Sequence, residues 1–245
     1  MYPPQIRRVA LELVDSGRSV NSVSRELGIS RGAITEWRAR ADALDERHGC
    51  PSPPRSTPQY SGLLGFYLGD GCISANRRTY ALRIACDKTL PGIVSDVTRC
   101  IEAVHPQRRT YLVSAPGVVV VQSYWKHWPC LFPQHGPGRK HQRTLGMTGW
   151  QWAIVEDHLA DFLRGLFHSD GCRVNNWATR MVAGEKKRFD YPRWQFTNES
   201  AEIMGWCRDA LDLVGIPWRQ SSRKNLSVST REGVARLDAL IGLKS

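Results

Sequence analysis

The sequence predicts an α+β protein in which a unit of helix, two strands, helix, two strands and helix occurs twice, preceded by a small all-α module. Three observations lead to this prediction. A nine-residue stretch recurs at a spacing of one hundred positions, at Leu63–Gly71 and Leu163–Gly171. The same order of helical and strand-like apolar patterns follows both copies. A run of prolines between Pro51 and Pro58 separates this duplication from a helical N-terminal segment.

Residues 1–42 are predicted to form three short helices. Apolar residues from Ile6 to Leu13 have helical spacing, Ser19 is a capping residue before the second helix, and Gly28 makes the turn into the third. This is the helix-turn-helix pattern. The segment resembles transposase- and resolvase-type helix-turn-helix domains, which implies DNA contacts by Ser30, Arg31, Thr35 and Arg38. The alternative is a small helical cap with a basic, solvated face.

Residues 43–59 are predicted to be a linker. The prolines at 51, 53, 54 and 58 favour a semi-rigid, extended chain. Such a linker lets the first module engage a partner separately from the rest of the chain.

The duplication is predicted to consist of two half-domains, residues 60–157 and residues 158–245. In each, strands, an amphipathic helix, two more strands and a closing helix follow the repeated stretch. The expected elements of the first half are a turn near Ala75–Arg78, a strand at Tyr80–Cys86, a helix over Ile93–Val104, strands at Arg109–Val113 and Val118–Gln122, and a helix near Tyr124–Phe132. Those of the second half are a strand at Tyr191–Asn198, a helix over Ile203–Val214, strands at Pro217–Ser221 and Leu226–Ser229, and a helix at Gly233–Ile241.

The repeated stretch carries small residues four places apart, Gly65/Gly69 in the first copy and Gly165/Ser169 in the second. Residues at this spacing share one helix face, so the two helices can pack with their backbones close together. The packing would place Asp70 and Asp170 side by side at helix C-termini, where the helix dipole is already negative. Two carboxylates there repel unless one is protonated or a cation lies between them. The glycine after each aspartate is expected to form a left-handed helix C-cap.

The two stretches resemble the paired motifs of single-chain LAGLIDADG homing endonucleases. They match at the second small position, at the aspartate and at the final glycine, and they depart at the family's first acidic position, which is Leu68 in one copy and His168 in the other. The alternative is two amphipathic helices with similar caps. The shared Asp-Gly-Cys at 70–72 and 170–172 argues against it.

The resemblance implies which residues form the site. The catalytic, metal-binding acids are Asp70 and Asp170, and the carbonyls of Gly69 and Ser169 complete an oxygen site suited to Mg²⁺ or another divalent cation such as Mn²⁺. In the family a lysine after the closing helix of each half approaches the cleavage centre, and Lys140 and Lys244 are the candidates here. The family also implies two antiparallel sheets that together grip a DNA duplex.

The charge of the chain agrees with a nucleic-acid partner. The net charge is +11 and the isoelectric point is near 9.6, so double-stranded DNA is the leading partner and an anionic membrane surface the second. Arginine, lysine and glutamine on the predicted strands and turns are expected to contact bases and phosphates. These residues are Arg77, Arg78, Arg83, Lys186, Lys187, Arg193, Gln195, Arg223 and Lys224.

The sequence therefore predicts a sequence-specific double-stranded DNA endonuclease that hydrolyses phosphodiester bonds with a divalent cation. One chain holds both motifs, so a pseudo-dimeric monomer is expected. Without a membrane span or signal peptide, a cytoplasmic protein is expected. The alternative is a DNA-binding transcriptional regulator on the same scaffold that does not cleave. Fusion to a helix-turn-helix favours this alternative, and the presence of both aspartates favours the enzyme. A splicing intein is a third alternative, and it is disfavoured because no flanking block with an initiating Cys or Ser and a terminal His-Asn is recognisable in the sequence.

A separate hypothesis concerns zinc. His127, Cys130, His135 and His141 fall within fifteen residues and are ligand types that zinc accepts. Their spacing matches no known zinc motif, and ordinary packing and phosphate contacts are the favoured explanation.

Overall fold

The structure is a computed structural model that describes residues 4–38 and 50–245. The chain divides into two compact units, Met1–Ser52 and Pro53–Ser245, and each is described here by itself. The bounds of the four segments expected from the sequence, residues 1–42, 43–59, 60–157 and 158–245, remain predictions.

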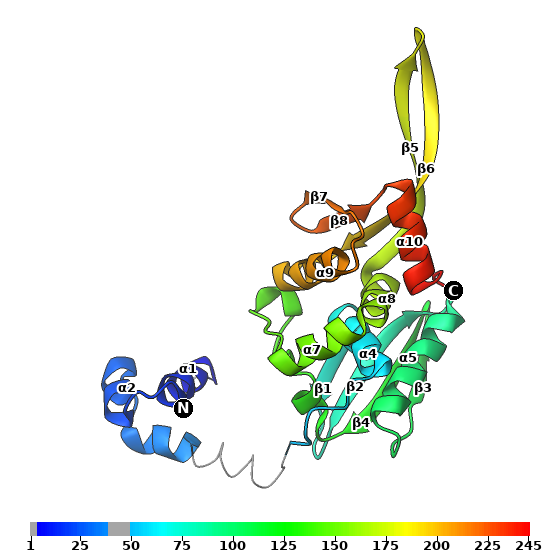
Figure 1. The fold of residues 1–245 in the computed structure, drawn as a ribbon. Coiled ribbons are helices and arrows are strands. Elements are labelled where there is room, and N and C mark those ends of the chain that lie inside the picture. The colour runs from blue at the N-terminus through cyan, green and yellow to red at the C-terminus, as the bar shows by residue number, and fades with distance from the viewer. Residues whose placement is uncertain (1–3, 39–49) are drawn as a thin grey trace. The chain divides into compact units, whose positions relative to one another are not determined.

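The first unit contains the three predicted helices (Figure 1): α1 (Pro4–Asp15), α2 (Val20–Leu27) and a helical segment at residues 31–38. The Ser19 side chain accepts a hydrogen bond from the backbone N–H of Ser22 and caps α2. Gly28 ends α2 at a φ of 64°, a left-handed conformation that glycine adopts without strain. A small core holds the helices together, formed by Ala10, Val14, Val23, Ile29 and Ile34. The prediction of a helix-turn-helix in this unit is confirmed.

The second unit contains the predicted αββαββα order twice. The first half consists of α4 (Pro58–Leu68), β1 (Gly71–Ala75), β2 (Tyr80–Asp87), α5 (Pro91–Val104), β3 (Tyr111–Ala115), β4 (Val118–Trp125) and α6 (Trp128–Leu131). A 3₁₀ turn, η1 (Lys140–Gln142), and a further helix, α7 (Gly149–Asp157), lead into the second half. That half consists of α8 (Leu159–Asp170), β5 (Gly171–Val182), β6 (Glu185–Thr197), α9 (Ala201–Leu213), β7 (Arg219–Ser222), β8 (Asn225–Val228) and α10 (Arg231–Ile241).

Each half forms one antiparallel four-stranded sheet. The strand orders are β1-β2-β4-β3 and β5-β6-β8-β7, so the two sheets have the same topology. The duplicated α+β fold is therefore confirmed. Helices α4 and α8 contact each other where the two halves meet (Figure 1). One hydrophobic core, which includes buried residues of both sheets, surrounds this helix pair.

The hairpin of β5 and β6 is longer than its counterpart in the first half and extends away from the body of the unit (Figure 1). The sequence predicted a strand only from Tyr191, whereas β6 begins at Glu185. Residues 185–190 are all exposed, so they carry no apolar alternation that would reveal a strand. A turn at Ala183 and Gly184, both with positive φ, closes the hairpin.

Among the described residues, no helix combines the length and the hydropathy that a membrane span requires.

Candidate functional site

The small residues of the repeated stretch bring α4 and α8 into backbone contact. A Cβ atom added to Gly65 would lie 2.5 Å from the carbonyl oxygen of Phe162 and 2.9 Å from Cα of Gly165. A Cβ atom on Gly165 would in turn lie 2.9 Å from Cα of Gly65, and one on Gly69 would overlap the side chain of Ser169. Real Cβ atoms do not approach so closely. The predicted close packing of the two helices is confirmed.

The prediction of left-handed caps after the aspartates is wrong. Gly71 and Gly171 are not among the residues with positive φ, and Gly171 is extended, with φ −97° and ψ 155°. These glycines are needed for another reason. A Cβ on Gly71 would lie 2.5 Å from Cα of Tyr67, and one on Gly171 would lie 2.5 Å from the carbonyl oxygen of Phe167. The strand that follows each helix begins very close to the last turn of that helix. Only the hydrogen atom of a glycine fits at this position.

The helix pair brings Asp70 and Asp170 into one site. A Cβ on Gly69, the residue before Asp70, would lie 3.2 Å from Oδ2 of Asp170. Burial raises the pKa of Asp170 to about 6, and the negative charge of Asp70 adds to this shift. Burial also raises the pKa of Asp70, although that residue is more exposed than Asp170, while the Lys244 and Lys140 ammonium groups oppose the rise. The two carboxylates repel each other at a place where the helix dipoles already disfavour negative charge.

Each candidate lysine lies at the end of one motif helix. The Nζ atom of Lys140 donates to the backbone carbonyls of Tyr67, of Leu68 at 2.9 Å and of Gly69 at 3.1 Å. The Nζ atom of Lys244 donates to the carbonyl of Ser169 at 3.3 Å and to that of Gly171 at 3.0 Å.

These contacts place a cation at the negative end of each helix. Burial lowers the pKa of Lys140 to about 8, and the charges of Asp170 and Asp70 limit the fall. The ammonium form therefore still predominates at neutral pH. The two lysines and the two aspartates form one charged cluster.

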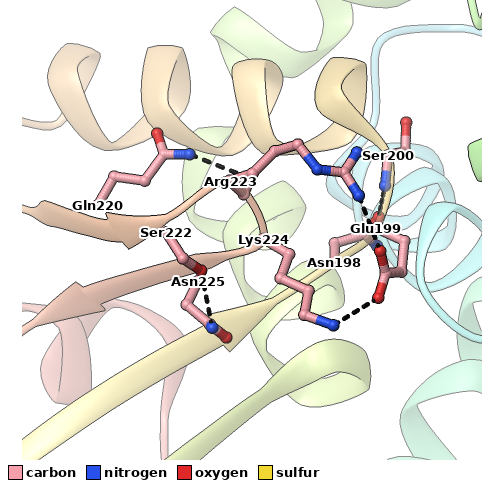
Figure 2. A network of polar contacts seen from close by, with 8 residues as sticks. All are labelled: Asn198, Glu199, Ser200, Gln220, Ser222, Arg223, Lys224 and Asn225. Atoms are coloured by element: carbon pink, nitrogen blue, oxygen red, sulfur yellow. Dashed lines mark hydrogen bonds and ion pairs between the residues drawn. The ribbon is translucent and has the colours of Figure 1, made fainter.

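Asn198 belongs to this site and was missed by the sequence analysis. Its Nδ2 atom donates to Oδ2 of Asp170 at 2.6 Å. The residue follows β6 directly and lies beside Glu199 and Ser200 in the network of Figure 2. The only signal in the sequence was its position at the end of the predicted strand Tyr191–Asn198, and nothing local indicates which helix end that strand approaches.

Two cavities flank the helix ends. A cavity of about 520 Å³ is lined by Asp170, Lys140, Asn198 and Glu199, among others. A smaller one of about 210 Å³ is lined by Asp70, Lys244 and the neighbouring Asp87. Each cavity thus combines the aspartate of one motif with a lysine.

Leu68 and His168, which stand where the motif has its first acidic residue, are both buried. Leu68 is 1 % exposed and His168 is 3 % exposed. Burial lowers the pKa of His168 to about 4, so its ring is neutral at pH 7, and its Nε2 atom lies 3.4 Å from the carbonyl oxygen of Gly242. Uncharged side chains at these positions avoid the cost of a buried charge.

The strand register decides which basic residues share a face. Trp194 and Phe196 of β6 are buried, so the alternate residues Arg193 and Gln195 lie on the opposite, open face of the sheet. Lys187 shares that face, whereas Lys186 lies on the other one. That Lys186, Lys187, Arg193 and Gln195 contact DNA stays a prediction.

In the first sheet Arg83 lies on the face opposite the buried Leu82 and Ile84. It donates to Oε1 of Gln122 at 3.3 Å and to the hydroxyl of Ser74. Arg77 and Arg78 are exposed between β1 and β2.

Two of the predicted DNA-binding residues are engaged in ion pairs. Arg223 Nη2 lies 3.2 Å and Lys224 Nζ 2.9 Å from the carboxylate of Glu199 (Figure 2). Both basic residues are exposed in the turn between β7 and β8. A phosphate would have to compete with Glu199 for them.

In the first unit, the predicted DNA-binding residues Ser30, Arg31, Thr35 and Arg38 are all exposed. The Ser30 hydroxyl accepts from the backbone N–H of Ala33, which is the contact of a helix cap. Arg31 Nη1 donates to Oδ1 of Asn21 at 3.3 Å.

The zinc hypothesis is not met in the described part of the chain. No three His, Cys, Asp or Glu side chains there are grouped to hold a metal ion. Cys130 Sγ lies 3.7 Å from Nδ1 of His127, the ring of His135 packs edge-on against Tyr80, and His141 is exposed.

The raised pKa of Asp170 predicts how stability depends on pH without metal. The folded protein binds the proton of the Asp170 carboxyl more tightly than the unfolded chain does, because an aspartate in the unfolded chain has a pKa of about 3.9. The stabilisation is therefore complete below that value and is lost as the pH rises through about 6. In EDTA, Asp170→Asn should remove this component and unfold at a higher temperature than the wild type at pH 7.5. Thermal unfolding of both proteins at pH 5 and 7.5 measures it, and parallel pH dependences would contradict it.

Three solved structures illustrate what this chain is similar to in fold. The chain is similar to I-DmoI in complex with DNA and Mn, with 10 % identity over 78 % of this chain and 99 % of that chain and a TM-score of 0.49. It is similar to the LAGLIDADG meganuclease I-AabMI bound to uncleaved DNA, with 12 % identity, coverages of 75 % and 82 %, and a TM-score of 0.47. It is also similar to the N-terminal LAGLIDADG domain of DUF199/WhiA, with 12 % identity, coverages of 80 % and 85 %, and a TM-score of 0.44.

I-AabMI and the WhiA domain are LAGLIDADG proteins. Residues 1–55 match the family model HTH_Tnp_1, described as "Transposase". No curated protein matches the sequence.

Proposed function

We propose that this protein is a sequence-specific endonuclease of homing type, which hydrolyses one phosphodiester bond in each strand of a DNA duplex with a divalent cation. One observation carries the proposal: two packed helices present Asp70 and Asp170 at one end, each helix end bound by a lysine far away in sequence. A merely structural helix pair has no use for two repelling carboxylates at that end. Because one chain supplies both, the active form is a monomer.

The residues at the helix ends fit a hard divalent cation. Asp70 and Asp170 supply carboxylates, and the carbonyl oxygens of Gly69 and Ser169, which already accept from the lysines, have a second lone pair to offer. Mg²⁺ is held in many enzymes by one or two carboxylates, with waters and substrate phosphate completing its shell. Burial raises the pKa of Asp170, the negative charge of Asp70 adds to the rise, and a bound cation would favour the charged form of both carboxylates. When bound, the cation supplies a more acidic water and stabilises charge on the phosphate.

In the proposed hydrolysis, the oxygen of water bonds to phosphorus, one bond between phosphorus and a sugar oxygen breaks, and a proton of the water ends on that sugar oxygen. The ammonium groups of Lys140 and Lys244 are held in place by backbone carbonyls. Their positive charges therefore face the phosphate without reorganisation as negative charge builds on it.

The open faces of the two sheets are proposed to bind the duplex. Arg193, Gln195 and Lys187 are on one face, and Arg83 is on the corresponding face of the other sheet. Arginine pairs with guanine and glutamine with adenine in the major groove, while lysine contacts phosphate. The helix-turn-helix unit adds affinity because a second module on the same chain binds at high effective concentration.

The experiment that tests this function is selection from a random DNA library with and without Mg²⁺. Recovery of one family of sequences cut only with Mg²⁺ supports the endonuclease. A DNA-binding regulator is the second candidate, favoured by the fused helix-turn-helix unit, which matches the family model HTH_Tnp_1. It is supported if one family of sequences is bound but remains uncut with Mg²⁺ or Mn²⁺.

The role of the first unit is tested by Arg31→Ala. Loss of one arginine contact to guanine or phosphate should weaken binding to the selected DNA by about tenfold. The position of the cut should not change, because the cutting residues lie in the other unit. Arg231→Ala, which removes an equally exposed charge at the start of α10, is the control. Equal affinities of the two variants in a fluorescence anisotropy titration would show that Arg31 does not contact DNA.

A further inference from the structure

The register of the two sheets shows which residues of the two half-sites correspond. Gly71 pairs with Ile84 in the first sheet, and Gly171 pairs with Phe196 in the second. Cys86 lies two residues after Ile84, and Asn198 lies two residues after Phe196. The two residues therefore occupy corresponding positions in the two halves. The two motif helices are alike at the aspartate, but the corresponding position holds a thiol near the end of β2 in one half and an amide directly after β6 in the other.

In the second half the amide is held in a defined orientation. Asn198 Oδ1 accepts from the backbone N–H of Ser200 at 2.8 Å, which leaves Nδ2 to donate to Oδ2 of Asp170 at 2.6 Å. Ser200 is the N-cap of α9 and is 2 % exposed, so the acceptor side of the amide is anchored to a helix (Figure 2). The bond to Asp170 is charge-assisted, and it restrains rotation of the carboxylate.

Among the residues that the structure describes, none restrains Asp70 in an equivalent way. Cys86 is 4 % exposed, and burial, with the added charge of Asp70, raises the pKa of its thiol to about 12. A neutral thiol is a weak donor, and the Cys86 Sγ atom lies 3.9 Å from the carbonyl oxygen of Ile84. Within residues 4–38 and 50–245, no side chain donates a hydrogen bond to the carboxylate of Asp70. Asp70 is also the more exposed of the two aspartates.

We propose that the two half-sites are functionally unequal and that the protein therefore nicks one strand before the other. Asn198 is a positioning residue that holds the Asp170 carboxylate in one orientation, whereas Asp70 has no such partner among the described residues. This inference rests on the proposed endonuclease function. Hydrogen-bonded partners of metal-binding carboxylates typically contribute ten- to a hundredfold to activity or metal affinity, and the lower end gives a strand preference of about tenfold. A nicked duplex accumulates as the intermediate.

The test exchanges the two residues. A duplex carrying the selected site is labelled with a different dye on each strand, and the cleavage rate of each strand is measured for the wild type, Asn198→Cys and Cys86→Asn. Asn198→Cys should slow the faster strand by about tenfold and bring the two rates together. Cys86→Asn should speed the slower strand. Ser222→Ala, at the far end of the network in Figure 2, is the control and should keep the wild-type ratio.

A second measurement requires neither metal nor DNA. In EDTA, Asn198→Cys should lower the unfolding temperature more when it is introduced into the wild-type protein than when it is introduced into the Asp170→Asn variant. The charge-assisted hydrogen bond exists only in the wild-type background. Circular dichroism also shows whether each variant folds. Equal strand rates in the wild type, or an Asn198→Cys that slows both strands alike, overturn the inference and leave the endonuclease intact. A wild type that cuts neither strand overturns the proposed function itself.

Discussion

Replacing Asp70 or Asp170 by asparagine is expected to lower strand cleavage by at least about 100-fold, because a carboxylate that holds the cation contributes several kcal/mol of charge stabilisation. Asparagine keeps the shape of the side chain and removes its charge. Affinity for the selected DNA should stay the same or rise, since a negative charge facing the phosphates is lost. Cleavage is measured in Mg²⁺ under single-turnover conditions, and affinity is measured in Ca²⁺ or EDTA.

Asp161→Asn is the matched control. Asp161 lies on the same helix as Asp170 but in its first turn, away from the paired helix ends. It should cleave as the wild type does. If Asp70→Asn and Asp170→Asn also cleave normally, the cation is held elsewhere and the proposed site is wrong. If all three proteins and the wild type bind but never cut, the regulator is the correct function.

The second large effect is expected on stability, from Gly65→Ala. The new methyl group would lie 2.5 Å from the Phe162 carbonyl oxygen and 2.9 Å from Cα of Gly165, and both are backbone atoms that cannot rotate away. Overpacking of this kind costs about 3 kcal/mol. For a unit of this size the unfolding temperature should fall by about 10 °C. Because the helices must separate, cleavage should be lost as well.

Gly62→Ala provides a control on the same helix. A Cβ there would meet Asp161 and Cys100 at 3.6 Å, which is ordinary contact. Replacing a helical glycine by alanine where the new methyl group makes only ordinary contacts stabilises by about 0.5–1 kcal/mol. The two substitutions are chemically identical and should have opposite signs in thermal unfolding followed by circular dichroism. A similar change in both would mean that α4 and α8 are not held at backbone contact.

The pairing of the motif helices could be predicted because its signals are local. Gly65 and Gly165 sit at helical spacing from Gly69 and Ser169, and a face of small residues has one obvious partner when it occurs twice. The aspartates followed from the same spacing. Lys140 and Lys244 were placed by resemblance to a family, and the structure adds what they touch, namely the last carbonyls of the two helices.

Other features depended on contacts between distant parts of the chain. Asn198 acquires its role only because β6 ends beside α8, and no periodicity reports that proximity. Gly71 was assigned the wrong backbone conformation because the usual reason for a glycine after a helix is a left-handed cap. Here the reason is the nearness of Tyr67, one turn earlier. Lys186 and Lys187 are the same residue type at neighbouring positions, and only the register of β5 and β6 assigns them to different faces of the sheet.

The sequence by itself determined the duplicated α+β plan, the helix-turn-helix unit, the contact between the motif helices and the position of two aspartates at the paired helix ends. All of these follow from spacing within a few residues or from repetition, and both are visible along the chain. The tertiary structure decided what surrounds each aspartate: a lysine at each helix end, an anchored amide in one half and a buried thiol in the other. These environments result from long-range packing, in which residues tens of positions apart meet, and such meetings leave no pattern in the local sequence.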